Sequence, residues 1–255
     1  MKIKVLGAFG SEGLGQRPSA FLVNDKILVD AGTVPGALTV EEQSEITGAI
    51  LSHAHLDHTV GLAFLTDTLA TATGNHPPIT AIGTAPVIDA LRTHAFNSVL
   101  WPNFNAIPSR DAPVLTYRVL QEEVEQVVGD LRVTPIQVNH SVPANGFILR
   151  NGDVSFIYTG DTGPTERLWA AARSVRGLKA IIIESAFPSR LEDLARAAGH
   201  MTPSLLEREL AKMPSDVPIW VFHIKPPFYQ EIAEELAKID PERIQILEQG
   251  KTYSI

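Results

Sequence analysis

The chain has 255 residues, of which 44% are apolar and 20% are charged, the composition of a globular protein with a substantial core. Its net charge of −8 disfavours a broad nucleic-acid-binding face, because such a face shows clusters of basic residues. The absence of cysteine excludes disulfides, thiolate metal sites and cysteine nucleophiles.

The N-terminal stretch MKIKVLGAFG enters a strand pattern at once and lacks the apolar core of a signal peptide. No apolar run reaches the ~18 residues that a membrane helix needs. We therefore expect a soluble cytoplasmic protein that spans no membrane.

The first part of the chain predicts short strands at residues 3–6, 20–23, 27–29 and 49–51. Asn24-Asp25, between two apolar runs, predicts a hairpin turn. Gly10, Gly13 and Gly15 lack the spacing of a dinucleotide site, and we interpret them as turn residues.

Helical periodicity follows, with Leu62, Leu65 and Leu69 on one face of a helix. A second helix, which Thr84 could cap and Pro86 could begin, places His94 on a core or boundary face beside Val87 and Leu91. Between these two helices, His76 is interpreted as a loop residue.

The second half mixes strands with helices. Strands are predicted at 133–138, 146–149, 154–158, 180–183, 220–222 and 244–247, and helices at about 165–175, 203–213 and 229–239. Strands thus cluster and then mix with helices in each half of the chain. This order favours two sheets packed face to face with helices outside over a single doubly wound sheet.

The segment HAHLDH at 53–58 contains four metal-type side chains in six positions, between a strand and a helix. On an extended stretch, His53 and His55 point the same way and can hold one ion. Asp57 and His58 lie past the turn and can face a second ion. A single histidine here would be interpreted as a polar loop residue, but four potential metal ligands in six positions indicate a metal site.

Three further candidates each follow an apolar, strand-like run: His140, Asp161 and His223. Each alone could be a loop or edge residue. Together with the first motif they complete two sites, since histidine suits zinc and a carboxylate often bridges two ions.

These residues resemble the metallo-β-lactamase superfamily, through HAHLDH at 53–58, His140, Asp161 in YTGDT and His223 in FHIKP. The resemblance implies an α/β fold over residues 1–255 as a single domain. The fold would be a four-layer αβ/βα sandwich with a dinuclear metal site at one edge. It assigns His53, His55 and His140 to the first ion, Asp57, His58 and His223 to the second, and Asp161 to both. The two divalent ions are expected to be zinc, with manganese or iron as alternatives.

Within this superfamily, HAHLDHTVGL at 53–62 is similar to the signature of class II cyclic-nucleotide phosphodiesterases, from which Thr59 departs at an aliphatic position. IIIESAFPSR at 181–190, GHMTP at 199–203 and WPNF at 101–104 also have counterparts there. The resemblance implies hydrolysis of a 3′,5′-cyclic nucleotide (cAMP or cGMP) to a 5′-nucleoside monophosphate by a hydroxide that bridges the ions.

The GHMTP segment also has a direct physical interpretation. Thr202 can cap a helix that begins at Pro203, which places His200 beside a helix N-terminus that favours an anion. His200 can then protonate a leaving oxygen, and Glu184 could orient it. The alternatives are a loop residue for His200 and a solvent-exposed carboxylate for Glu184. With Asp57, these two residues are the predicted catalytic groups.

The sequence leaves rivals open: a transfer-RNA 3′-processing endonuclease, a lactone or thioester hydrolase, and a metal-binding sensor without turnover. The expected partner is a small phosphodiester rather than a nucleic acid, and a homodimer is compatible with the sequence. Trp101, Phe104, Phe187 and Phe228 could stack on a purine, although core packing explains each of them as well.

Overall fold

The structure, a computed structural model, describes residues 1–72 and 77–255, and its strands within these ranges form two seven-stranded mixed sheets. The first sheet runs in the order β14 (Thr252–Ser254), β1 (Lys2–Gly7), β2 (Ala20–Val23), β3 (Ile27–Ala31), β4 (Gly48–Ile50), β5 (Ile79–Gly83) and β6 (Leu115–Val119). The second runs in the order β13 (Ile244–Ile246), β12 (Ile219–Phe222), β11 (Leu178–Glu184), β10 (Val154–Tyr158), β9 (Asn145–Asn151), β8 (Leu131–Gln137) and β7 (Gln126–Val128).

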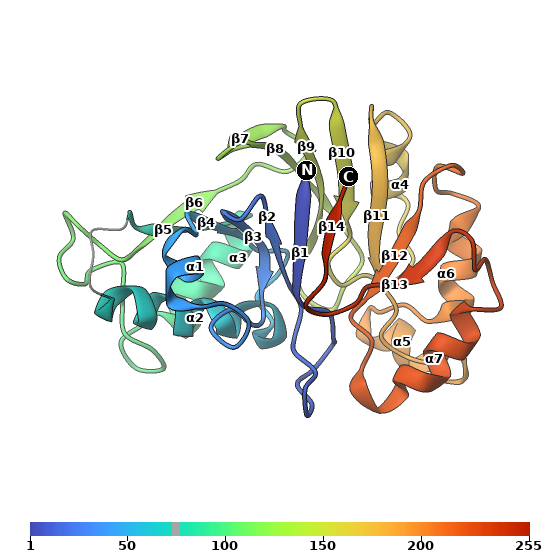
Figure 1. The fold of residues 1–255 in the computed structure, drawn as a ribbon, viewed down its shortest axis with the longest axis horizontal. Coiled ribbons are helices and arrows are strands. Elements are labelled where there is room, and N and C mark those ends of the chain that lie inside the picture. Colours follow the sequence, from blue (N-terminus) through green and yellow to red (C-terminus); the bar gives the residue numbers. More distant parts are fainter. Residues whose placement is uncertain (73–76) are drawn as a thin grey trace.

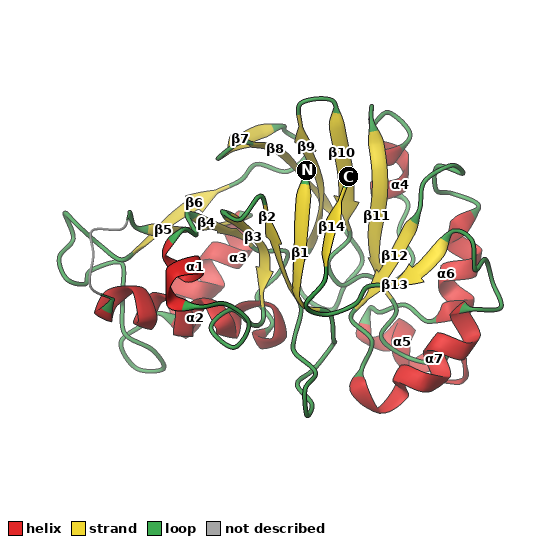
Figure 2. Ribbon diagram, in the orientation of Figure 1, coloured by secondary structure: helices red, strands yellow, loops and turns green. Residues whose placement is uncertain are grey.

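The helices lie outside the two sheets, as Figures 1 and 2 show. The first sheet is covered by α1 (Val40–Ser44), α2 (Leu56–Thr71), α3 (Ala85–Ala90) and the π-helix η1 (Leu91–Ala95). The second is covered by α4 (Arg167–Ala172), η2 (Ser189–Leu191), α5 (Glu192–Ala198), α6 (Pro203–Leu210), η3 (Pro226–Phe228) and α7 (Tyr229–Leu236). The predicted four-layer α/β sandwich is confirmed.

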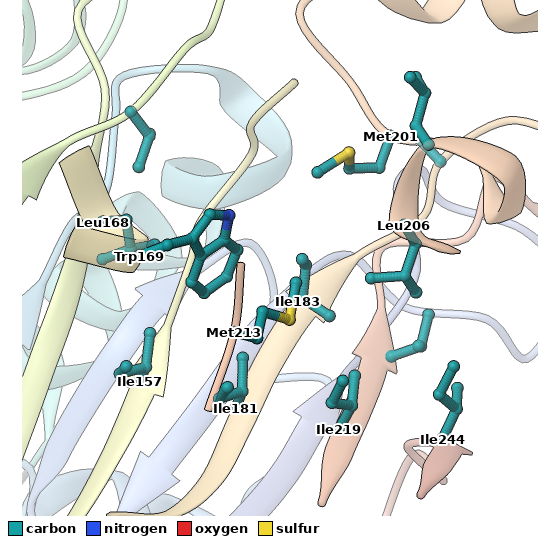
Figure 3. Close-up of a cluster of buried hydrophobic side chains, with 14 of the residues drawn as sticks. Ile157, Leu168, Trp169, Ile181, Ile183, Met201, Leu206, Met213, Ile219 and Ile244 are labelled. Atoms are coloured by element: carbon teal, nitrogen blue, oxygen red, sulfur yellow. The ribbon is translucent and has the colours of Figure 1, made fainter. Parts of the chain in front are cut away.

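Three clusters of buried apolar side chains separate the four layers. The middle cluster joins the sheets, and Phe21 packs edge-on against both Tyr158 and Phe222, with ring centroids 5.4 Å apart in each pair. A second cluster holds the first sheet against the helices. The third, drawn in Figure 3, packs the strands that carry Ile157 and Ile181 against the outer helices. Central strands are therefore buried on both faces, which explains their continuous apolar sequences.

The predicted elements are present, with ends shifted by a few residues. Asn24 and Asp25 turn between β2 and β3 with φ values of 49° and 58°, a left-handed conformation that these residue types tolerate. The elements that were missed are short or partly exposed: α1, α5, β5, β6, β7 and β14. Most of these segments carry too few buried positions to show a period, whereas β5, in which four of the five residues are buried, is too short to show one.

The prediction for His94 was wrong, because its side chain is exposed. The helix changes from α to π geometry at Leu91, and the wider turn rotates His94 away from the face that carries Val87. His76 lies outside the described residues. In the described ranges, no helix has both the length and the apolarity to cross a membrane. That residues 1–255 form a single domain stays a prediction.

The topology brings several strand ends to one edge of the sandwich. In the first sheet β3, β4 and β5 are parallel, and in the second β10, β11 and β12 are parallel. β8 shares their direction, since it and β10 each pair antiparallel with β9. The loops that follow β4, β8, β10 and β12 therefore meet at the carboxyl ends of these strands, where α/β folds place their ligands.

Candidate active site

The first group of predicted ligands comes together at this edge. His53 follows β4, His55 is the N-cap residue of α2, His140 follows β8 and Asp161 follows β10. The Nδ1 atom of His55 lies 3.1 Å from Nε2 of His53 and 3.2 Å from Nε2 of His140. Oδ2 of Asp161 lies 3.7 Å from Nε2 of His53. These four residues present their ligand atoms to one point.

The second group shares Asp161. Nε2 of His223, directly after β12, lies 3.1 Å from Oδ2 of Asp161, and Nε2 of His58 lies 3.2 Å from Oδ1 of the same carboxylate. Oδ2 of Asp57 is 3.8 Å from Nε2 of His223. Within each group the ligand atoms lie within 4.8 Å of one another. The structure thus gathers all seven predicted ligands into two adjoining sets.

The donor atoms fit divalent ions. Nε2 of His58, Nε2 of His223 and Oδ1 of Asp161 are buried and have no hydrogen-bond partner in residues 1–72 and 77–255, an arrangement that a cation would satisfy. Two nitrogens at zinc-ligand distance and tetrahedral angle are ~3.3 Å apart, close to the 3.1 and 3.2 Å spacings around His55. The cluster is therefore compatible with divalent metal binding, whereas the role of each residue as a ligand stays a prediction.

Hydrogen bonds on the far side of the rings direct these nitrogens inward. The backbone carbonyl of Gly199 accepts from Nδ1 of His140 at 2.8 Å. Nδ1 of His223 lies 3.0 Å from the hydroxyl of Ser19, which itself donates to the carbonyl of Phe9 and so accepts from the ring. With the ring proton on Nδ1, each Nε2 keeps a lone pair for a cation.

Asp30, at the end of β3, is a functional candidate that the sequence did not reveal. It is fully buried and adopts a φ of 54°, and its carboxylate accepts from Nδ1 of His58 at 2.6 Å and from the hydroxyl of Tyr158 at 2.5 Å. It also accepts from the backbone N–H and the hydroxyl of Ser52, each at 2.7 Å. The hydroxyl of Ser52 lies 2.9 Å from Nδ1 of His53, so Asp30 orients two candidate ligands.

Burial and charge shift the pKa values of the cluster. Burial opposes a charge on His58, but the carboxylates of Asp161 and Asp30 outweigh it and raise the pKa of His58 well above its usual value. Burial likewise opposes a charge on Asp161, yet His223 and His58 hold its pKa well below the usual range. Burial and neighbouring imidazoles lower the pKa of His53. Because a metal ion binds neutral histidine, binding at the second set would displace the proton that the raised pKa keeps on His58.

His200 and Glu184 form a pair beside the cluster. Nδ1 of His200 donates to Oε1 of Glu184 at 2.7 Å and lies 4.0 Å from Oδ2 of Asp161. Glu184 is fully buried, so the alternative of a solvent-exposed carboxylate is wrong. Burial lowers the pKa of His200 and so does the ammonium of Lys225, but Glu184 outweighs both and the pKa is raised.

The carboxylate of Glu184 also holds the surrounding backbone. It accepts from the N–H groups of Thr162 at 2.8 Å and of Ala186 and Met201 at 3.1 Å each. Thr162 follows Asp161 directly, so one buried side chain fixes the loops that carry Asp161 and His200. Glu184 is thus placed to position His200.

Backbone conformation and close packing both favour glycine at position 199, directly before His200. Gly199 ends α5 with a φ of +71°, and a Cβ atom there would lie 2.7 Å from Cα of His140. The predicted cap of α6 is confirmed, since Thr202 accepts from the N–H of Leu205 at 3.2 Å. His200 therefore lies between a left-handed glycine and a capped helix, with its side chain turned toward the cluster.

All four candidate aromatics belong to, or pack against, the apolar clusters of the core. Phe104 is buried, and the indole N–H of Trp101 donates to the carbonyl of Ala63 in α2 at 3.0 Å. Phe187 is mostly buried but lies edge-on to His200, with centroids 5.7 Å apart, and Phe228 packs beside it at 6.2 Å. The last two line the His200 side of the cluster.

Thr59, which stands at an aliphatic position of the phosphodiesterase signature, lies in the first turn of α2. Its side chain is buried, and its hydroxyl donates to the carbonyl of His55 at 2.9 Å. The buried polar group therefore keeps a partner within the first turn of the helix. The neighbouring His58 makes its hydrogen bond to Asp30 at 2.6 Å.

Comparison with known proteins agrees with this geometry. Residues 25–224 match the family model described as the β-lactamase superfamily domain. With its two sheets between outer helices and its cluster of histidines and aspartates, the chain belongs to the metallo-β-lactamase superfamily.

Several individual proteins of this superfamily are similar to the chain in sequence or in structure. A protein of Yersinia pestis named as a probable 3′,5′-cyclic-nucleotide phosphodiesterase is 31% identical over 214 residues, which cover 74% of this chain and 60% of that protein. A 3′,5′-cyclic-nucleotide phosphodiesterase of Aliivibrio fischeri is 29% identical, covering 86% of this chain and 82% of the relative. The crystal structure of unliganded yeast PDE1 superposes with a TM-score of 0.83 at 21% identity, over 98% of each chain, and shows a shared fold.

Proposed function

We propose that the protein is a metal-dependent phosphodiesterase that hydrolyses 3′,5′-cyclic nucleotides, such as cAMP and cGMP, to 5′-nucleoside monophosphates. The observation that carries this proposal is the His200–Glu184 pair, held at 2.7 Å beside a cluster of seven metal-type residues. The names of two relatives at about 30% identity support the choice of substrate.

The proposed ligand sets are His53, His55 and His140 for one ion, and Asp57, His58 and His223 for the other, with Asp161 shared. Two divalent ions held by these sets would lower the pKa of water to about 7 and would offset charge on the phosphoryl oxygens. Histidine-rich sets favour zinc, and manganese and iron are the alternatives.

The protein's own groups would supply orientation and a proton. Glu184 fixes Nδ1 of His200, which leaves Nε2 as the atom that protonates the departing O3′ of the ribose. Asp57 is still 29% exposed at its side chain, and its carboxylate can orient the attacking water at the open side of the cluster. Breaking the P–O3′ bond leaves the phosphate on O5′, which is the 5′-monophosphate.

The test is a panel of cyclic nucleotides, linear phosphodiesters, a transfer-RNA precursor and a lactone, assayed with purified protein of known metal content. Asp161→Ala should lose metal and turnover together, whereas Asp67→Ala, at an exposed position of α2, should lose neither. His200→Ala should retain the metal and lose roughly 10²–10⁴-fold in kcat. Full cyclic-nucleotide turnover by Asp161→Ala, or preference for another member of the panel, would refute the proposal.

A further inference from the structure

Lys225 lies two residues after His223 and faces the same side of the cluster as His200. Its ammonium donates to the carbonyl of Gly10 at 3.1 Å and lies 5.4 Å from the ring centroid of Phe187. That ring in turn packs against His200 with centroids 5.7 Å apart. The ammonium is therefore held over the aromatic ring that borders the proposed proton donor.

The contact with Gly10 ties this ammonium to the metal-type residues. A Cβ atom on Gly10 would lie 2.9 Å from Nε2 of His223, so the backbone that accepts from Lys225 passes directly against the candidate ligand. The rings of His223 and His200 are stacked with centroids 5.5 Å apart. Lys225 thus flanks the proposed site of chemistry from the loop around Gly10.

Lys225 has no close ion pair in the described part of the chain. Within residues 1–72 and 77–255, no carboxylate oxygen lies within 4.0 Å of Nζ of Lys225, although the side chain is partly buried. Lys251 has a similar ring contact, 5.9 Å from Tyr253, but also pairs with Glu248 at 2.7 Å. An ammonium has three donors and Gly10 accepts from one, so Lys225 keeps two donors for an anion.

We propose that Lys225 binds a non-bridging phosphoryl oxygen of the substrate and of the 5′-monophosphate product. The inference rests on the proposed function for the substrate's identity, although an ammonium placed here would bind any phosphate ester that enters the cluster. The phosphate would lie between Lys225 and the metal-type residues, with Nε2 of His200 facing its leaving oxygen. Phe187 and Gly10 would act by fixing the ammonium.

The experiment compares Lys225→Met and Lys225→Gln with Lys251→Met, which removes the same charge where Glu248 already neutralises it. Binding of adenosine 5′-monophosphate is measured by calorimetry on the metal-loaded proteins, and hydrolysis of cAMP gives KM and kcat. Loss of a charge-assisted contact should weaken binding of the monophosphate roughly 10- to 100-fold in both Lys225 variants. KM should rise by a similar factor with kcat nearly unchanged, because the contact is made in both the ground and the transition state. A Tm close to the wild-type value would show that a Lys225 variant is folded, so that its loss of monophosphate affinity is not due to misfolding.

Monophosphate affinity and KM within twofold of the wild-type values, in either folded Lys225 variant, would overturn the inference. A fall in kcat at constant KM would also overturn it, since the residue would then act on chemistry rather than on phosphate binding. The calorimetric measurement of adenosine 5′-monophosphate binding does not depend on whether the protein hydrolyses cAMP. Wild-type protein that binds the monophosphate through Lys225 but does not hydrolyse cAMP would refute the proposed function and leave this inference standing.

Discussion

Replacing Asp30 by Asn tests whether the fold itself orients the metal-type residues. Asn keeps the size of the side chain and tolerates the left-handed φ of 54° at this position, so the change isolates the negative charge from backbone strain. The carboxylate accepts four hydrogen bonds of 2.5–2.7 Å, two from Ser52, one from His58 and one from Tyr158. An amide offers one acceptor oxygen and turns two N–H donors toward groups that also donate.

Three of the four bonds end on Oδ2, so an amide oxygen placed there keeps them only as contacts to a neutral acceptor, and the NH2 group that replaces Oδ1 leaves the buried N–H of Ser52 without an acceptor. Breaking a buried, hydrogen-bonded charge typically costs about 3–5 kcal/mol. For a chain of this size that corresponds to a fall in Tm of roughly 10 °C. His58 also loses the negative charge of the group that orients its ring, which should weaken zinc binding about 10- to 100-fold.

The assay is zinc competition against a chelator, together with thermal melting of the metal-free protein. Asp130→Asn is the matched control, because Asp130 is an exposed carboxylate that accepts from Asn24 and Asn151 at 2.7 and 2.8 Å. Asp30→Asn with wild-type zinc affinity and a Tm within 2 °C of the wild-type value would show that the buried carboxylate does not orient the cluster.

Gly199→Ala should lower the free energy of unfolding by about 1–2 kcal/mol, because alanine is strained at a φ of +71°, and thermal melting will measure this loss. Its Cβ atom would lie 2.7 Å from Cα of His140, so zinc binding in chelator competition should also weaken. Arg208 lowers the pKa of Glu192 to about 2, so the stability that this carboxylate contributes is present above its unfolded pKa of about 4.3 and is lost as the pH falls through 2. The melting difference between wild type and Glu192→Gln should therefore be full at pH 6 and shrink progressively below pH 4. Zinc added to chelator-treated protein should raise its unfolding free energy, by about 4 kcal/mol at 1,000 times the dissociation constant, and an unchanged Tm would contradict the fit of the cluster to cations.

The parts of the site that the sequence predicted share one local rule. His53, His140, Asp161 and His223 each follow an apolar run, and that run forms a buried strand in the structure. Because the carboxyl ends of such strands meet at one edge, residue type and position along the chain were sufficient to bring these side chains together. The helix cap at Thr202 was equally local, since its partner Leu205 is three residues away.

Pairings between distant segments could not be predicted in this way. β14 pairs with β1 through Lys2 and Ser254, and no property of either three- to six-residue segment specifies the other. The change of helical geometry at Leu91 was also invisible, because an apolar period continues across it until His94 turns to solvent. Sequence periodicity reports which residues can share a face and does not report where a helix changes its pitch.

Asp30 is the instructive omission, because it obeys the same local rule as Asp161 and still escaped notice. Both aspartates lie near the carboxyl end of a buried apolar strand, Asp30 within β3 and Asp161 after β10, but the hydrogen-bond partners of Asp30 lie 22, 28 and 128 residues along the chain, at Ser52, His58 and Tyr158. A carboxylate with four donors around it needs no cation, whereas Oδ1 of Asp161 is buried and has no hydrogen-bond partner among the described residues, although Nε2 of His58 lies 3.2 Å from it. The distinction between an orienting carboxylate and a candidate ligand therefore depends on whether the fold supplies its partners, and only the three-dimensional arrangement of those donors reveals it.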